Sequence, residues 1–201
     1  MAKKADQVFL NVPYDARFEN LFLAYIAGIT ALGLVPRATL EIPGGTRRLE
    51  KILVLISKCE YSIHDLSRVE LDRISPRVPR FNMPFELGLT VARHWKARPS
   101  EHTWFVCESM DRRLLKSLSD LNGTDPYIHG GSATGVLREL LNMFELSDTQ
   151  PSLETLTRTF QKLHRRKSGV LAASGSGTLF TKRAFRGLCL AAKEAIPRVA
   201  R

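Results

Sequence analysis

The hydrophobic positions of this chain follow two alternating patterns. Five short apolar runs are typical of strands, and each is followed by a segment whose apolar residues recur at the spacing of a helix. The predicted strands are 7–12, 34–41, 61–67, 103–109 and 126–131. The predicted helices are 18–32, 47–59, a segment that begins near Pro84, 110–121 and 135–145.

Strands that alternate with helices in this way predict βαβ units and a mostly parallel sheet. Right-handed crossovers leave few arrangements of five strands, and the flavodoxin-like order 2-1-3-4-5 is the natural one. We therefore predict a doubly wound α/β domain over residues 1–150.

The pattern changes after residue 150. Segments 153–166 and 179–195 have helical spacing and are joined by "SGVLAASGSGT". Residues 151–201 therefore predict a helical hairpin, either added to the sheet domain or forming a small separate module. The glycine-rich "SGSGT" favours a turn over a phosphate-binding loop, because no clear strand precedes it and no Lys follows in register.

Charge is concentrated in this C-terminal segment. The chain has a net charge of +10, and residues 152–201 contain eleven Lys or Arg but only two Asp or Glu. Such a segment could contact nucleic acid, an acidic partner or a membrane surface, or it could be a solvated helical face. These alternatives stay open at the level of sequence.

Composition indicates a cytoplasmic protein without membrane contact. The start, "MAKKADQ", runs into a predicted strand rather than into the apolar region of a signal peptide, and the uncharged stretch 21–35 has only 15 residues. Three cysteines and five histidines are scattered, so neither a disulfide framework nor a metal site is predicted.

Polar residues collect where the predicted strands end. In an open parallel sheet this edge is where ligands bind. The candidates are Asn11, Tyr14, Arg37, Glu41, Asp65, Ser67, Asn82 and Glu86. We expect them to face one crevice.

The usual nucleotide-binding and hydrolase motifs are missing from this edge. The first strand is followed by "NVPYDARF", which lacks the GxGxxG phosphate cradle, and the chain contains neither GxxxxGK[ST] nor GxSxG. A site built on carboxylates is what remains.

Two stretches, "YSIHDLSR" and "FNMPFELGLTVA", resemble the nucleoside 2-deoxyribosyltransferase-like superfamily, which is related to Toll/interleukin-receptor (TIR) domains. The resemblance spans roughly residues 8–131. It implies that Glu86 is the nucleophile of N-glycosidic bond cleavage and that Asp65 binds the sugar or base or assists proton transfer. It also implies that Asn11 and Tyr14 line the pocket, and that the protein is a homo-oligomer.

The chain departs from the family pattern before the ELG motif. Asn82 stands where the family usually has an Asp, and the preceding loop is longer and more basic. Cleavage passes through an oxocarbenium-like transition state that a carboxylate stabilises, while a neutral leaving base also needs a proton. The cationic nicotinamide of NAD needs none. A missing acid therefore favours NAD as the substrate, or a loss of catalysis.

Each candidate also has a structural interpretation. Glu86 could be a partner of the helix dipole, and Asp65 could cap a turn. Arg37 could pair with Glu41 instead of a ligand. Strand alternation turns His64 away from Asp65, which favours a packed or exposed histidine over a base. Two aromatic side chains are expected to pack in the core, Trp95 and Trp104.

Three functional hypotheses follow. The first is an enzyme that cleaves the N-glycosidic bond of a nucleoside, a nucleotide or NAD, with no resident cofactor. The second is a non-catalytic nucleotide-binding or signalling module that has kept the pocket. The third is a nucleic-acid-associated protein that uses the basic C-terminal helices, with strongly salt-dependent binding.

Overall fold

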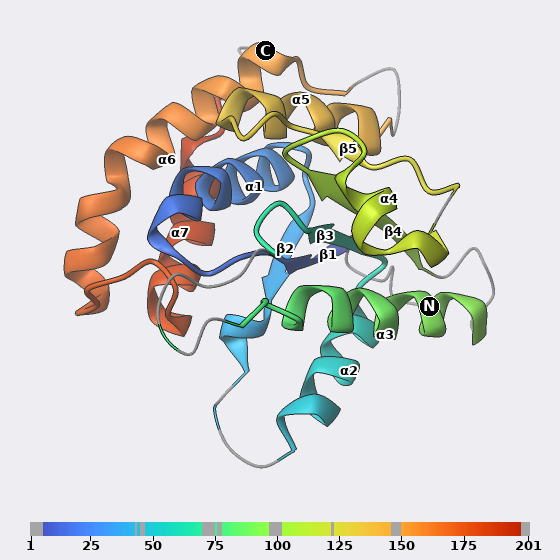
Figure 1. The fold of residues 1–201 in the computed structure, drawn as a ribbon. Helices are drawn as coiled ribbons and strands as arrows, with labels where there is room; N and C mark the ends of the chain where they lie inside the picture. Colours follow the sequence, from blue (N-terminus) through green and yellow to red (C-terminus); the bar gives the residue numbers. More distant parts are fainter. Residues whose placement is uncertain are drawn as a thin grey trace, which may run out of the picture.

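The computed structural model describes residues 6–42, 44, 47–69, 75, 78–96, 102–121, 123–145 and 150–197. Its centre is a five-stranded parallel sheet in the order β2-β1-β3-β4-β5, which confirms the predicted α/β fold and strand order (Figure 1). The strands are β1 (Gln7–Asn11), β2 (Val35–Ala38), β3 (Tyr61–Asp65), β4 (Thr103–Glu108) and β5 (Tyr127–Ile128).

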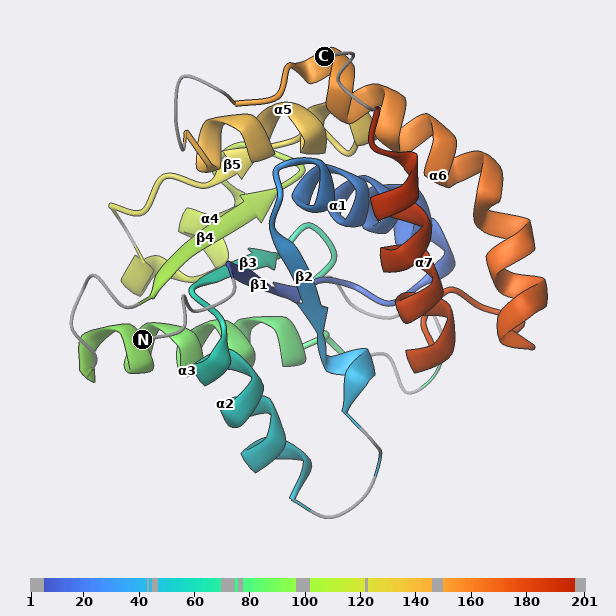
Figure 2. The same cartoon turned by 180° about the vertical axis from the view of Figure 1, so that it is seen from behind.

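Helices cover both faces of the sheet. The α-helices are α1 (Glu19–Ala31), α2 (Arg48–Lys58), α3 (Asn82–Lys96), α4 (Arg113–Ser117), α5 (Ala133–Met143), α6 (Leu153–Ser174) and α7 (Lys182–Ala195). Helices α1 and α5 lie on one face, with α6 and α7 outside them, while α2, α3 and α4 lie on the other (Figures 1 and 2).

Helix α1 is the centre of the hydrophobic core. Ten of its 13 residues are buried. It lies between the sheet and the C-terminal helices, and a single cluster joins Leu10 of β1 and Phe22 of α1 to Leu163 of α6 and Leu188 of α7. The C-terminal hairpin therefore packs against α1 through apolar side chains.

The connection between the last two helices is shorter than predicted. Helix α6 continues to Ser174 instead of ending near residue 166, and it ends at Gly175, which has a positive φ of 61°. The interior Gly169 weakens a helix by roughly 1 kcal/mol relative to Ala. Val170 and Leu171 offset this cost by packing against the core.

A strand, a helix and a tryptophan side chain also differ from their predictions. Strand β2 ends at Ala38, because residues Thr39–Glu41 form a 3₁₀ turn that the Glu41 carboxylate stabilises by accepting from the Ala38 amide at 3.1 Å. The predicted helix 110–121 consists of α4 and a 3₁₀ turn at Ser119–Leu121. Trp95 is 82% exposed, so its expected packing is wrong, whereas Trp104 packs against a small apolar cluster beneath α3.

Among the described helices, none combines the length and the apolar character needed to cross a membrane.

Candidate functional site

A cavity of about 860 Å³ opens at the carboxyl ends of β1 and β2, between α2 and the start of α3. We call it the Glu86 cavity. It is lined by Asn11, Val12 and Tyr14 after β1, by Thr39 after β2, by Arg48, Leu49 and Ile52 of α2, and by residues 78–83, 85 and 86. Four of the eight predicted site residues therefore meet there: Asn11, Tyr14, Asn82 and Glu86.

Glu86 contributes the acidic group of this cavity. Its side-chain carboxylate makes no hydrogen bond or ion pair with any residue that the structure describes. Burial raises the pKa of Glu86 to about 7, and the positive charge of Arg48 opposes this rise. A desolvated carboxylate without a protein partner is available to a ligand.

The helix dipole explains Glu86 poorly. Helix α3 begins at Asn82, two residues before Pro84, so Glu86 is its fifth residue and the first turn contains no acid. The influence of the dipole is largest within the first turn.

Asn11 connects the end of β1 to the start of α3. Its buried side-chain Nδ2 donates to the Met83 carbonyl oxygen and to His64 Nδ1, each at 2.8 Å. Met83 lies three residues before Glu86 on the same helix. Asn11 thus fixes the first turn of α3 against the sheet and thereby positions Glu86.

His64 is a packed histidine, in agreement with the structural interpretation. The side chain is fully buried, and burial lowers its pKa to about 3, so the ring is neutral. Its Nδ1 accepts the hydrogen bond from Asn11, which occupies that lone pair. His64 is therefore unsuited to act as a base.

Tyr14 forms the wall of the cavity that lies closest to the hydrophobic core around α1. Its hydroxyl lies 3.0 Å from Thr39 Oγ1, and its ring contacts Phe22 and Phe180. Burial, and to a lesser extent the charge of Glu86, raises the pKa of Tyr14. The hydroxyl therefore stays protonated and can donate to a ligand.

Asp65 is not among the residues that line the Glu86 cavity. It is fully buried, accepts from the Tyr25 hydroxyl at 2.8 Å and from the Ser67 amide at 2.9 Å, and lies 3.1 Å from His129 Nε2. Tyr25 lies on α1 and His129 directly follows β5, whereas Ser67 follows β3. The structure thus separates Asp65 from Glu86, and the catalytic role implied for Asp65 has no geometric support.

Arg37 and Glu41 also lie elsewhere. Arg37 Nε donates to Glu41 Oε1 at 2.8 Å, and a second guanidinium nitrogen donates to Gln7. Both charged residues line a separate cavity of about 400 Å³ beside α7. The buried Ser67 hydroxyl has no hydrogen-bond partner among the described residues and does not line the Glu86 cavity. The prediction of one crevice for all eight residues is therefore wrong.

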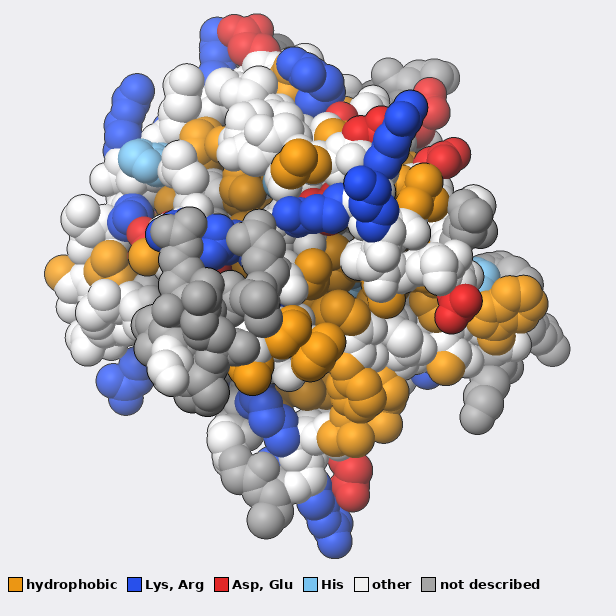
Figure 3. Space-filling model, viewed as in Figure 1, with side chains coloured by type: hydrophobic (Ala, Val, Ile, Leu, Met, Phe, Trp, Pro, Cys, Tyr) orange, Lys and Arg blue, Asp and Glu red, His pale blue; other side chains and the backbone are white. Residues whose placement is uncertain are grey.

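The structure adds cavity residues that the sequence analysis missed. Arg48 places a positive charge beside Glu86, and Phe81 and Phe85, which are 68% and 55% exposed, present aromatic rings at the start of α3. Hydrophobic side chains gather over α2 and the start of α3 (Figure 3). The i, i+4 spacing of the two phenylalanines was the available signal.

The loop before α3 is fastened at both ends by one carboxylate. Asp15 Oδ2 accepts from Arg68 Nε at 3.1 Å and from Arg80 Nη1 at 2.8 Å. Its other oxygen accepts from the Arg17 and Phe18 amides. Asp15 therefore holds Arg68 and Arg80 against the first turn after β1.

Comparison with known proteins gives no family model and no curated relative that matches the chain. Within the described part of the molecule, no group of three or more His, Cys, Asp or Glu side chains could hold a metal ion.

Proposed function

We propose that the Glu86 cavity binds a nucleoside moiety and that Glu86 cleaves its N-glycosidic bond. The observation that carries this proposal is the carboxylate of Glu86, which faces a cavity at the carboxyl edge of a parallel sheet without a partner among the described residues. Ligands of open parallel sheets bind at this edge.

In the proposed reaction the ionised Glu86 oxygen attacks the anomeric carbon while the base departs with the electrons of the glycosidic bond. The product is an acylal ester between Glu86 and the sugar. Water then adds to the anomeric carbon, releases the carboxylate and gives up one proton, so the sugar leaves with retained configuration. With a pKa of about 7, a large share of Glu86 is ionised at neutral pH.

The surroundings of Glu86 fit a nucleotide. The rings of Phe81 and Phe85 offer apolar faces on which a base can stack, and the Arg48 guanidinium can pair with a phosphate. The Tyr14 hydroxyl is a donor for a sugar oxygen or for the base.

The number of acids in the cavity favours a leaving group that needs no proton. Glu86 is the one Asp or Glu among the described residues that line the cavity. A neutral purine or pyrimidine requires a general acid, whereas nicotinamide leaves NAD as a neutral molecule without protonation. We therefore place NAD first among the substrates, followed by deoxynucleosides.

The test is release of free base by the wild-type protein and by Glu86→Gln, followed by chromatography with NAD and a panel of deoxynucleosides. The matched control is Glu50→Gln, because Glu50 is an exposed glutamate in the first turn of α2 that does not line the cavity. We expect a loss of about a thousandfold in Glu86→Gln and unchanged release in Glu50→Gln.

A second function is favoured by the position of Asp65. With that carboxylate buried in its own network, the cavity could bind a nucleotide without turning it over. In that case calorimetry detects NAD binding by the wild-type protein and by Glu86→Gln, and neither protein releases nicotinamide. Absence of both binding and release would refute the two functions together.

A further inference from the structure

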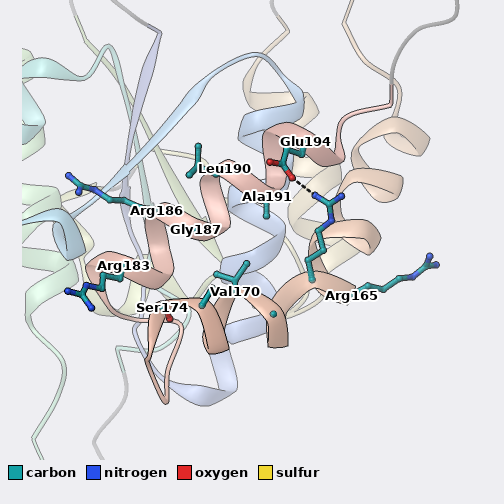
Figure 4. Close-up of a pocket in the computed structure, with 12 residues that line it drawn as sticks. Arg165, Val170, Ser174, Arg183, Arg186, Gly187, Leu190, Ala191 and Glu194 are labelled. Carbon is teal, nitrogen blue, oxygen red and sulfur yellow. Dashed lines mark hydrogen bonds and ion pairs between the residues drawn. The ribbon is translucent and has the colours of Figure 1, made fainter.

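A groove separate from the Glu86 cavity runs between the two C-terminal helices. It has a volume of about 730 Å³, and its described lining residues all belong to α6 and α7 (Figure 4). Its centre is apolar, with Val170 from α6 and Leu190 and Ala191 from α7. Leu190 is 62% exposed and adds accessible apolar surface to the groove.

Two glycines give the groove its shape. A Cβ on Gly187 would lie 2.8 Å from Val170 Cγ1, so the missing side chain allows α6 and α7 to approach closely. A Cβ on Gly169 would meet no atom within 4 Å, so this position opens into free space. The groove between two closely packed helices can accept a third helix, whose axis would lie about 8–10 Å from each of them.

Arginines border the apolar centre on both sides. Arg183 and Arg186 extend from α7 on one side and Arg165 from α6 on the other, with Val170 and Leu190 between them (Figure 4). None of these three arginines forms an ion pair with a residue that the structure describes. The acidic residue of the groove, Glu194, forms an ion pair with Arg166 at 2.8 Å.

The apolar centre distinguishes between possible occupants. Sites for single-stranded nucleic acid combine positive charge with aromatic stacking platforms, and none of the described residues that line this groove is aromatic. A second copy of the chain in a two-fold dimer would bring the same three arginines opposite these, which like-charge repulsion disfavours. The charge complement of the groove is an acidic partner whose surface also carries aliphatic side chains.

We propose that this groove docks an acidic amphipathic helix of a partner protein. Aliphatic side chains at i, i+3, i+4 and i+7 of that helix lie over Val170 and Leu190, and its flanking carboxylates pair with Arg165, Arg183 and Arg186. The groove is independent of Glu86, so this inference holds whether or not the protein is an enzyme.

The test uses a fluorescein-labelled peptide of about 18 residues, long enough for a helix when bound, with Leu on one face and Glu on both flanks. Fluorescence anisotropy of the peptide is measured against the full-length protein. A peptide of the same composition in scrambled order serves as the control probe. We expect micromolar binding of the amphipathic peptide and binding about tenfold or more weaker for the scrambled one.

Three variants separate the contribution of charge from that of shape. Replacing both Arg183 and Arg186 by Gln weakens binding about tenfold or more. Gly169→Leu fills the groove, abolishes binding and leaves the thermal midpoint unchanged or higher, because the site is open and Leu favours helix. Lys162→Gln, at an exposed position of α6 outside the groove, leaves binding within about twofold.

The proposal is overturned if the amphipathic peptide does not bind, if the scrambled peptide binds as tightly, or if binding survives Gly169→Leu. An oligothymidylate that binds more tightly than the peptide would instead assign the groove to nucleic acid, and vesicles of anionic phospholipid that compete for it would assign it to a membrane surface. Either result also overturns the proposal.

Discussion

The two faces of the sheet are covered by different numbers of helix layers: α1 and α5 with α6 and α7 outside them on one face, which we call the thick face, and a single layer on the other, the thin face. On one face α1 is almost wholly buried, because α6 and α7 cover the side that does not touch the sheet. On the other face α2 buries only Ile52, Leu55 and Ile56, and exposes Leu53 and Val54. The thick face supplies most of the core, whereas the thin face leaves room for a cavity. This division indicates that stability and ligand binding can be perturbed separately.

The largest expected effect is on the thick face. Phe22 is fully buried and contacts the rings of Tyr14, Phe180 and Phe185. We expect Phe22→Ala to lower the free energy of unfolding by about 4 kcal/mol, measured by urea denaturation. The matched change on the thin face is Leu53→Ala, at a side chain that is 41% exposed, and it should cost about 0.5 kcal/mol or less. Equal losses of unfolding free energy in Phe22→Ala and Leu53→Ala would show that the two faces contribute equally to stability.

The next effect concerns the buried network of Asp65. Asp65→Ala leaves the Tyr25 hydroxyl without its acceptor and the His129 ring without its neighbouring carboxylate. We expect a loss of about 3 kcal/mol in the free energy of unfolding. Because Asp65 does not line the Glu86 cavity, base release measured well below the thermal midpoint should fall by less than about threefold. A loss as large as that of Glu86→Gln would restore the catalytic role implied by the resemblance.

The position of Asp65 also shows where the sequence stops being informative. Alternation correctly places His64 and Asp65 on opposite faces of β3, but it does not say which face holds the ligand. The strand register identifies that face. Asn11 pairs with His64, and paired residues of parallel strands point to the same side of the sheet. The cavity therefore lies on the side of the sheet to which His64 points, and Asp65 points toward α1. Strand order follows from the alternation of elements, whereas register depends on contacts distant in sequence.

Arg37 and Glu41 illustrate a second limit. The sequence correctly places both residues near the end of the second strand, and their mutual pairing was one of the alternatives. Which cavity they line depends on α7, since Cys189 and Lys193 of that helix form the opposite wall. No local pattern in residues 34–41 encodes the approach of a helix some 150 residues away in sequence.

A smaller effect is expected at the connection between β1 and α3. Asn11→Asp keeps the size of the side chain but replaces its donor group, so neither the Met83 carbonyl nor His64 Nδ1 receives a hydrogen bond. We expect a loss of about 2 kcal/mol in the free energy of unfolding at pH 7. Base release should also fall, with its pH profile displaced, because the start of α3 is no longer fixed. An unchanged pH profile of base release, together with a lower free energy of unfolding, would show that Asn11 has a purely structural role.

The pH dependence of stability should reveal Glu86. Its pKa rises from an ordinary value of 4.5 to about 7 in the folded protein, so the unfolded chain releases this proton at lower pH than the folded one. The contribution of Glu86 therefore decreases the free energy of unfolding as pH rises from about 4.5 to 7, by roughly 1 to 3 kcal/mol after allowing for partial exposure. Urea denaturation of the wild-type protein and Glu86→Gln at pH 5 and pH 8 measures it. The difference between the two proteins should shift in favour of Glu86→Gln at pH 8, and a pH-independent difference would contradict the raised pKa.

We propose that the thin face holds a catalytic carboxylate, Glu86, whose ionised form does not stabilise the fold. The most direct test of this proposal measures nicotinamide release from NAD and the free energy of unfolding on the same preparations of the wild-type protein and Glu86→Gln. We expect Glu86→Gln to lose release while its free energy of unfolding at pH 8 is equal to or higher than that of the wild type. Undiminished release by a folded Glu86→Gln protein would contradict the proposal.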